Sequence, residues 1–220
     1  MRRFGRNMPE ISALFWDNGG VILTNGWDRD ARHRAVTKFQ LDRTEFEDRH
    51  ELVLDAFETG ELSLDDYLKR TVFYRPRSYT PEDFKKFMFD QSQSFPESLS
   101  FVVRLARTTE RLMAALNNES LEINEYRIAA FKLRDCFDIF LSSCYLRVRK
   151  PNPEIYRLAL KITQRAPSEC ILIDDRALNL ECAHELGINT ILYKNVTQLR
   201  DELARYGVAD NENPRSAAAE

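Results

Sequence analysis

The chain has 220 residues, of which 43% are hydrophobic, and its formal net charge is −3. This composition predicts a folded protein with a substantial core, built as one large domain or as one domain with an insertion. The charges are interspersed without a basic stripe, which argues against nucleic-acid binding. No apolar stretch approaches the roughly 18 residues that a membrane-spanning helix needs.

The N-terminal residues and the cysteines indicate in which cellular compartment we expect the protein. Residues 1–9 hold three arginines and no apolar segment, so we expect a frayed basic end and not a secretory signal. The four cysteines show no CxxC spacing, which is typical of scattered, reduced thiols. We therefore expect a cytoplasmic protein, a monomer or a homodimer, with neither a membrane nor a nucleic acid as partner.

Five short apolar runs have the length of strands, and helical patterns separate most of them. This alternation predicts an α/β fold with a mostly parallel sheet and helices on both faces. Helices are expected at Glu154–Ile162, Leu178–Leu186 and Val196–Tyr206. The runs lie within residues 11–23, 111–118, 137–143, 170–175 and 188–194.

The segment between the first two runs has a different pattern. Its apolar residues recur at helical spacing, and Ser63 and Thr80-Pro81 are typical of helix starts. We therefore predict an all-helical insertion at 24–97 within an α/β core formed by 1–23 and 98–208. The polar run at 209–220 is predicted to be disordered.

Polar side chains follow four of the apolar runs. Asp17 ends the first run and leads into Gly19-Gly20, although the chain has only seven glycines. The carboxyl ends of strands are where open α/β sheets bind ligands. The simpler interpretation is a tight turn that an Asp helps to cap. The other candidates are Asn117-Asn118, Ser142-Ser143 with Lys150 downstream, and Asp174-Asp175 with Asn179.

Paired acids beside a strand end suit Mg²⁺, which takes oxygen ligands and is often shared with a phosphate. A lysine nearby can neutralise phosphate oxygens, and an Asp can then act as a nucleophile towards an anionic substrate. For Asp174 and Asp175 the alternative is a helix cap with a first-turn acid. For Lys150 it is an ordinary surface lysine.

The motifs in their order resemble the haloacid dehalogenase-like hydrolase superfamily, in the branch whose helical cap follows the first motif. The resemblance spans roughly residues 11–206 and implies a Rossmann-like parallel sheet of order 5-4-1-2-3. Ala56-Phe57-Glu58-Thr59-Gly60-Glu61-Leu62-Ser63 matches a phrase common in such caps. The motifs are Phe15-Trp16-Asp17-Asn18-Gly19-Gly20-Val21-Ile22, Asn117-Asn118, Arg149-Lys150-Pro151-Asn152-Pro153 and Ile173-Asp174-Asp175-Arg176-Ala177-Leu178-Asn179.

The resemblance implies a role for each matched residue. Asp17 would form an aspartyl-phosphate and, with the Gly19 carbonyl and Asp175, would hold Mg²⁺. Lys150 would stabilise the nucleophile and the phosphoryl group, which Asn117 and Asn118 would help to bind. Asp174 and Asn179 would support the metal site.

Three positions depart from the family pattern. Most phosphatases of the family carry a second Asp as general acid and base where this chain has Gly19. They carry a Ser or Thr where it has Asn117, and often a glycine where it has Arg147. Loss of a general acid can cost about 10²–10⁴-fold in rate.

Three functions are therefore weighed. The favoured one is an Mg²⁺-dependent phosphatase, slow or selective, that acts on a small phosphorylated metabolite. The second is a degenerate member that binds a phosphorylated ligand or a protein without useful turnover. The third is a 2-haloacid dehalogenase, which would displace halide without a metal.

The helical insertion has to select the substrate, because the strand-end residues recognise only a phosphate. Trp27, Arg29 and Arg32 follow the first motif and are candidates for substrate contacts, whereas His33 is expected to be a surface histidine. Thr24–Gly26 and Phe95–Ser98 are the expected hinges for closure of the insertion over the site.

Overall fold

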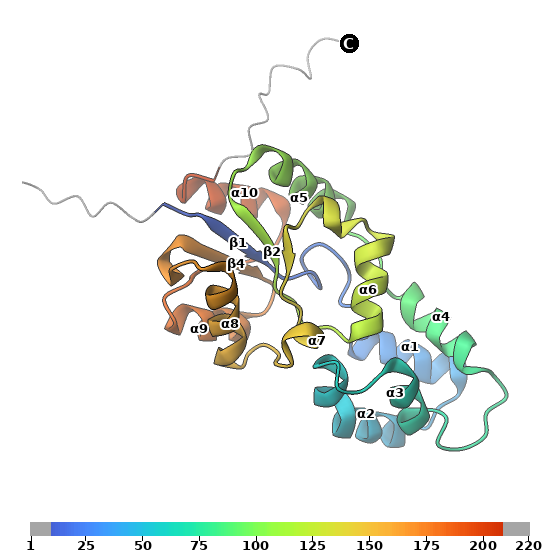
Figure 1. The fold of residues 1–220 in the computed structure, drawn as a ribbon. Coiled ribbons are helices and arrows are strands. Elements are labelled where there is room, and N and C mark those ends of the chain that lie inside the picture. The colour runs from blue at the N-terminus through green and yellow to red at the C-terminus, as the bar shows by residue number, and fades with distance from the viewer. Residues whose placement is uncertain (1–9, 209–220) are drawn as a thin grey trace, which may run out of the picture.

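The computed structural model describes residues 10–208, so the predictions for 1–9 and 209–220 lie outside the described residues. Five parallel strands form one sheet of order β3-β2-β1-β4-β5, as predicted. Figure 1 shows this sheet between layers of helices. The strands are β1 (Ala13–Trp16), β2 (Leu112–Ala115), β3 (Ile139–Phe140), β4 (Cys170–Asp174) and β5 (Asn189–Leu192).

Helices follow the strands in the α/β pattern. Two short 3-10 turns, Leu133–Asp135 and Pro167–Glu169, precede β3 and β4. The helices are α1 (Arg29–Phe39), α2 (Arg43–Glu58), α3 (Leu64–Thr71), α4 (Pro81–Asp90), α5 (Pro96–Thr108), α6 (Leu121–Ala130), α7 (Ser143–Leu146), α8 (Pro153–Thr163), α9 (Ala177–Glu185) and α10 (Val196–Arg205).

The side chains of β1 alternate between two hydrophobic clusters, because successive residues of a strand point to opposite faces of the sheet. Leu14 and Trp16 pack in the cluster that contains residues of α5 and α10. Ala13 and Phe15 pack in the cluster that contains residues of α8 and α9. Both faces of the central strand are therefore buried, which explains why its sequence is apolar throughout.

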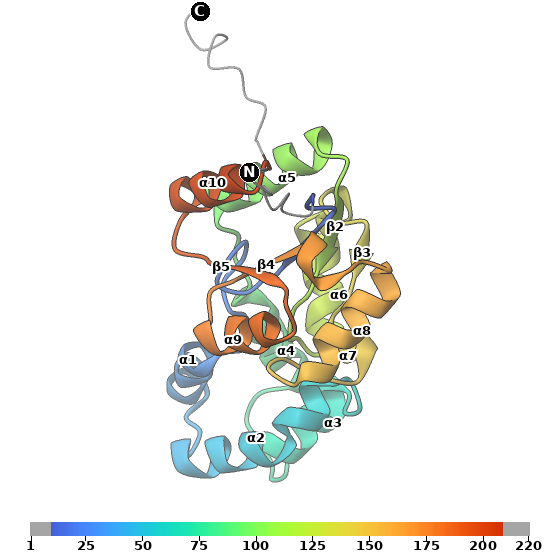
Figure 2. The same ribbon diagram turned by 90° about the vertical axis from the view of Figure 1, so that its left-hand side faces the viewer.

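Helices α1 to α4 form the helical insertion, defined as residues 24–95, with a hydrophobic cluster of its own. Figure 2 shows α1, α2 and α3 grouped at one end of the molecule. Both predicted helix starts are present: Ser63 accepts from the Asp66 N–H, and Thr80 forms a capping box with Asp83. Ile123 of α6 joins the cluster of the insertion.

The two chain segments that connect the insertion to the core run side by side. Leu23 and Ser94 form an antiparallel bridge, and the Thr24 N–H donates to the Gln93 carbonyl at 2.8 Å. The predicted boundary at residue 97 falls in the first turn of α5, where Ser98 is buried and hydrogen-bonds to Tyr193.

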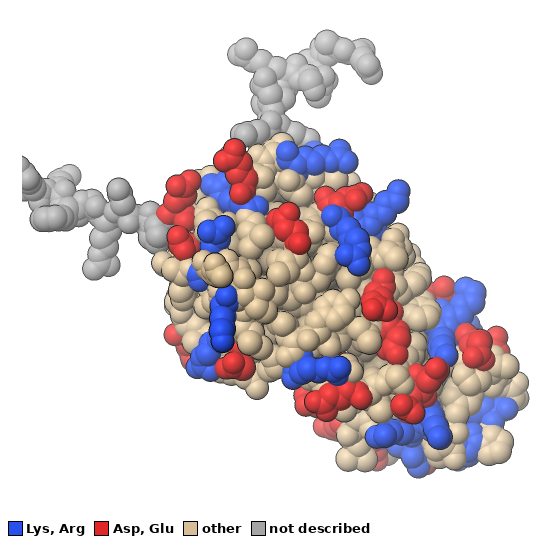
Figure 3. Space-filling view, viewed as in Figure 1, with Lys and Arg blue, Asp and Glu red and all other residues tan. Residues whose placement is uncertain are grey.

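The surface carries both charges. On the face drawn in Figure 3, acidic and basic side chains lie among one another over the sheet domain and over the helical insertion. Within residues 10–208, no helix combines the length and the apolar character needed to cross a bilayer. All four cysteines are free.

Candidate active site

Asp17 lies directly after β1, at the carboxyl edge of the sheet. Its N–H donates to the Ile173 carbonyl at 2.9 Å, and its side chain accepts from the Asn18 N–H at 2.8 Å. The chain then turns at Gly20, whose φ is +75°. A Cβ at Gly20 would overlap the Asp175 carboxylate. Glycine at this position therefore allows the Asp175 side chain to lie against the turn that follows Asp17.

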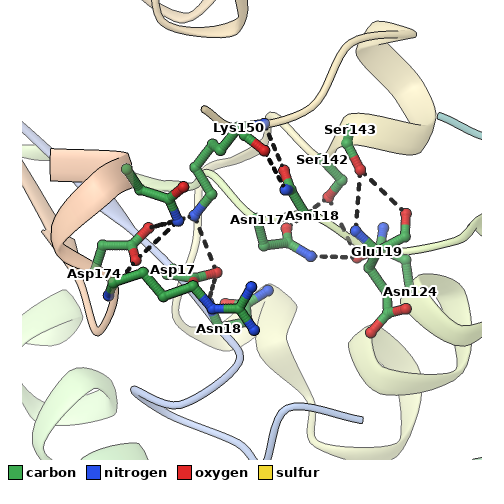
Figure 4. A network of polar contacts seen from close by, with 12 residues as sticks. Asp17, Asn18, Asn117, Asn118, Glu119, Asn124, Ser142, Ser143, Lys150 and Asp174 are labelled. Atoms are coloured by element: carbon green, nitrogen blue, oxygen red, sulfur yellow. Dashed lines mark hydrogen bonds and ion pairs between the residues drawn. The ribbon is translucent and has the colours of Figure 1, made fainter. Parts of the chain in front are cut away.

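Lys150 reaches the same edge from the loop before α8. Its Nζ lies 2.6 Å from Asp174 Oδ2 and 3.2 Å from Asp17 Oδ1, and the residue is 2% exposed. Figure 4 shows the ammonium between the two carboxylates. Asn118 binds both the N–H and the carbonyl of Lys150, each at 2.8 Å. This amide therefore fixes the backbone from which the lysine extends.

Asp174, the last residue of β4, is fully buried and has several donors. Asn179 Nδ2 contacts its two oxygens at 3.1 and 3.0 Å, and the Arg176 N–H donates at 2.9 Å. Together with Lys150 these donors satisfy both of its oxygens. Asp174 therefore holds Lys150 in place, and Asn179, which lines the cavity, holds Asp174.

Burial and the neighbouring charges alter the ionisation of this group of side chains. Burial raises the pKa of Asp17 to about 7, against the attraction of Lys150, while Asp174 and Asp175 raise it further. Burial and the Asp174 charge also raise the pKa of Asp175. Burial opposes the charge of Lys150, but Asp17 and Asp174 outweigh it and raise the pKa of the lysine.

The three acids have the geometry of a cation site. One carboxylate oxygen from each of Asp17, Asp174 and Asp175 lies within 4.8 Å of the others. Asp175 Oδ1 is buried and has no hydrogen-bond partner among the described residues. Carboxylate oxygens are ligands for Mg²⁺, and a buried carboxylate without a donor is costly unless a cation offsets it. The residues therefore fit a divalent cation.

The sequence led us to expect the Asn117 side chain in the phosphate-binding site. In the structure it does not line the cavity that Asp17 and Lys150 line. Asn117 is 1% exposed; its Nδ2 donates to Asn124 Oδ1 at 3.1 Å and its Oδ1 accepts from Ser142 Oγ at 2.8 Å. Figure 4 shows the amide turned towards Asn124. Both ends of the amide are thus engaged within the core, and Asn118 is the member of the pair that lines the cavity.

Gly19 lines the cavity, and the side chain of Asn25 lies over it. A Cβ at Gly19 would lie 2.9 Å from Asn25 Oδ1. The space into which a side chain at position 19 would extend is therefore occupied by the insertion's connecting segment. Arg147, also at a departure from the family pattern, has a φ of +59° and donates to the Thr59 carbonyl at 3.1 Å. Glycine adopts this left-handed conformation most readily, which accounts for the glycine that the family pattern often has where this chain has Arg147.

A cavity of about 460 Å³ is lined by Asp17, Lys150 and Asn179, and extends to the helical insertion. This volume falls in the range of about 300–1,000 Å³ typical of small-molecule sites. Trp27, Arg29 and Arg32 line it, as expected, while His33 is exposed. Sequence reasoning missed several other lining residues: Asn25, His50, Phe57, Glu119, Arg127 and Arg149.

Two arginines of the core contact the insertion beside the cavity. Arg127, which pairs with Glu119 of the core at 2.9 Å, donates to the Thr24 carbonyl, and Arg149 pairs with Glu58 of α2. Burial raises the pKa of Glu119 to about 7, against the Arg127 charge. Glu119 follows Asn118 directly, so the strand-end argument could have included it. The sequence around Arg149 contains no signal that predicts its partner Glu58.

Comparison with known proteins gives a consistent family. The sequence profile of the haloacid dehalogenase-like hydrolases matches residues 11–187. Flavin mononucleotide hydrolase 1 of Arabidopsis thaliana is 28% identical over 164 residues, which are 73% of this chain and 64% of that protein. The chain thus spans less than two thirds of this relative.

Two further matches cover nearly whole proteins. D-ribitol-5-phosphate phosphatase of Bacteroides thetaiotaomicron is 26% identical over 201 residues, 88% of this chain and 97% of that protein. A crystal structure of a family enzyme from the same species, in complex with magnesium and inorganic phosphate, has a TM-score of 0.68. It is 21% identical and covers 84% of this chain and 94% of that one, which shows a shared fold.

Proposed function

Because the chain belongs to the haloacid dehalogenase-like hydrolases, we propose that it hydrolyses a small phosphate monoester with Mg²⁺ as cofactor. One observation carries the proposal: Asp17, Asp174 and Asp175 converge with Lys150, and Asp17 and Lys150 line a cavity. Asp17, Asp175 and the Gly19 carbonyl would hold the ion. A relative named as a phosphatase and a similar fold crystallised with magnesium and phosphate support this assignment.

In the proposed reaction, an Asp17 oxygen attacks phosphorus, the ester P–O bond breaks, and the alcohol leaves with the bonding electrons. Water then attacks the aspartyl-phosphate and releases inorganic phosphate. Bound Mg²⁺ supplies positive charge that offsets the repulsion between carboxylate and phosphate. Lys150 Nζ, 3.2 Å from Asp17, lowers the pKa of the nucleophile against the effect of burial and would neutralise phosphate oxygens.

The proton for the leaving alcohol comes from water or from the substrate itself, because Gly19 provides no acidic side chain. This predicts slow turnover, or a preference for esters whose alcohol leaves readily. The same feature, together with the position of Asn117, keeps a binding-only protein as the second candidate. A dehalogenase fits less well, because Asp174 and Asp175 would repel a carboxylate substrate if no cation were bound.

We also propose that the helical insertion acts as a cap that closes over the cavity. Its separate hydrophobic cluster and its two paired connecting segments support this division. Gly26, with a φ of +63°, would act as one hinge. The second would end at Phe95, because the rest of the expected hinge Phe95–Ser98 lies in the first turn of α5. Protection of both segments from protease by Mg²⁺ and a phosphate analogue is expected; unchanged cleavage would contradict closure.

A screen of phosphorylated metabolites with Mg²⁺ tests the function, with the Asp17→Asn variant as blank. Phosphate release should exceed that of the blank and should stop in EDTA. Mg²⁺-dependent binding of phosphate without release would favour the binding-only protein. Halide release from 2-haloacids in EDTA would indicate a dehalogenase.

A further inference from the structure

His50 is a buried histidine that faces the cavity from the helical insertion. It is 3% exposed, whereas His33 and His184 are both exposed. Leu54 and Phe57 lie four and seven residues further along α2 and line the same cavity. This spacing puts the three side chains on one face of the helix. The insertion therefore lines the cavity with an imidazole and two apolar side chains on one helix face, in addition to the charged residues Asp28, Arg29, Arg32 and Glu58.

The distance between His50 and Tyr67 leaves the tautomer of this imidazole open, and the neighbouring hydrogen bond assigns it. Trp27 Nε1 donates to the Tyr67 hydroxyl at 2.8 Å, since an indole N–H can only donate. The hydroxyl lies 2.9 Å from His50 Nδ1 and has its own proton to donate there. Nδ1 is then an acceptor, and in the neutral ring the proton is on Nε2. Trp27 and Tyr67 are themselves buried, which holds the arrangement rigid.

The ring stays neutral at physiological pH. Burial lowers the pKa of His50 to about 3, and the charges of Arg32 and Arg149 lower it further. Both arginines are engaged, Arg32 with Glu47 at 3.0 Å and Arg149 with Glu58. His50 therefore acts as a hydrogen-bond donor and not as a proton source.

The Nε2–H has no partner among residues 10–208, although it is buried. A buried donor without an acceptor costs about 1–3 kcal/mol, which an acceptor in the cavity would recover. The nearby side chains Trp27, Leu54 and Phe57 provide apolar surface for a carbon skeleton.

We propose that His50 Nε2–H donates a hydrogen bond to an uncharged oxygen, a hydroxyl or a carbonyl, on the organic part of the substrate. The inference rests on the proposed phosphatase function and specifies its substrate class. The substrate is a phosphate monoester of an alcohol that carries a second oxygen function, and its carbon skeleton packs on Trp27, Leu54 and Phe57. His50 is a specificity-determining residue and takes no part in bond breaking.

Two esters test this class, glycerol 1-phosphate and phenyl phosphate, of which the second has no oxygen besides its phosphate. For His50→Phe, the KM of glycerol 1-phosphate relative to that of phenyl phosphate should rise about tenfold, with little change in kcat. His50→Gln, which keeps an N–H donor, should restore part of the difference. His33→Phe, at an exposed histidine, is the matched control. An unchanged KM ratio in His50→Phe would overturn the inference.

A measurement independent of turnover separates this inference from the proposed function. With ¹⁵N-labelled histidine, the NMR spectrum should contain one ring that has the proton on Nε2 and does not titrate between pH 5 and 8. In the Asp17→Asn variant, with Mg²⁺ and each anion at saturating concentration, glycerol 1-phosphate should shift this Nε2–H signal more than inorganic phosphate does. A proton on Nδ1, or equal shifts with both anions, would overturn the inference even if the protein is a phosphatase. If no ester is hydrolysed, the proposed function fails, and these spectra still decide the role of His50.

Discussion

Replacing Asp17 with Asn should make the metal-free protein more stable at neutral pH. Asp17 is 7% exposed, and burial raises its pKa from 3.8 to about 7. Between these two values the folded state binds a proton that the unfolded state has already released. The stability of the wild-type protein therefore falls as the pH rises through this window, and the Asn variant lacks this loss.

The size of the effect follows from the pKa shift. At about 1.4 kcal/mol per pKa unit, a rise of about three units makes ionised Asp17 cost about 4 kcal/mol at most. The attraction of Lys150, at 3.2 Å, already lowers this pKa, so the cost is a net value. We therefore expect a gain of up to about 4 kcal/mol at pH 7.5 and none, or a small loss, near pH 4.

Urea unfolding in EDTA, followed by circular dichroism between pH 4.5 and 7.5, measures this difference. Saturating Mg²⁺ should then stabilise the wild type, by about 2.7 kcal/mol at 100 times its Kd, and the variant much less. We expect ionisation of Asp17 to destabilise the folded protein. This expectation would be refuted if the difference in unfolding free energy between variant and wild type did not change with pH, or if the variant were the less stable protein at pH 7.5.

Three further substitutions test the site and its support. Asp175→Asn should weaken Mg²⁺ affinity, measured by calorimetry, at least tenfold. The melting temperature of the metal-free variant should stay equal or rise, because the repulsion between adjacent carboxylates is reduced. An unfolded variant would contradict the metal assignment. Lys150→Met leaves buried acids without their cation and should cost about 3–5 kcal/mol in urea unfolding, with loss of activity; a fully active variant would contradict its role. Gly19→Asp should raise the phosphatase rate more in an Asn25→Ala background than in the wild-type background, since Asn25 Oδ1 would lie 2.9 Å from the new Cβ. An equal increase in both backgrounds would show that Asn25 does not obstruct this position.

Much of the fold could be predicted from the sequence, because its signals are local. In both β1 and β4, four buried apolar residues are followed by an acid, and each strand with its polar end is contained in a few consecutive residues. Parallel strands bring these ends to one edge, so Asp17 and Asp174 were expected to be close. The starts of α3 and α4 were likewise legible, because Ser63 and Thr80 bond to N–H groups only three residues away.

The direction of individual side chains depends on contacts that local sequence does not contain. Asn117 follows β2 as predicted, but its amide faces Ser142, 25 residues later, and not the cavity. Asn25 covers Gly19 only because the connecting segment of the insertion passes over the turn.

His50 shows the same distinction most clearly. Its position on an apolar face of a helix follows from the sequence, but its neutral form depends on its burial. Its tautomer depends on Tyr67 and Trp27, which lie 17 and 23 residues away. The sequence alone determined the sheet, its order by resemblance, and the acidic edge, because short-range patterns encode secondary structure. Only the tertiary structure decided which polar groups have partners, because burial and hydrogen bonding are properties of the packed chain.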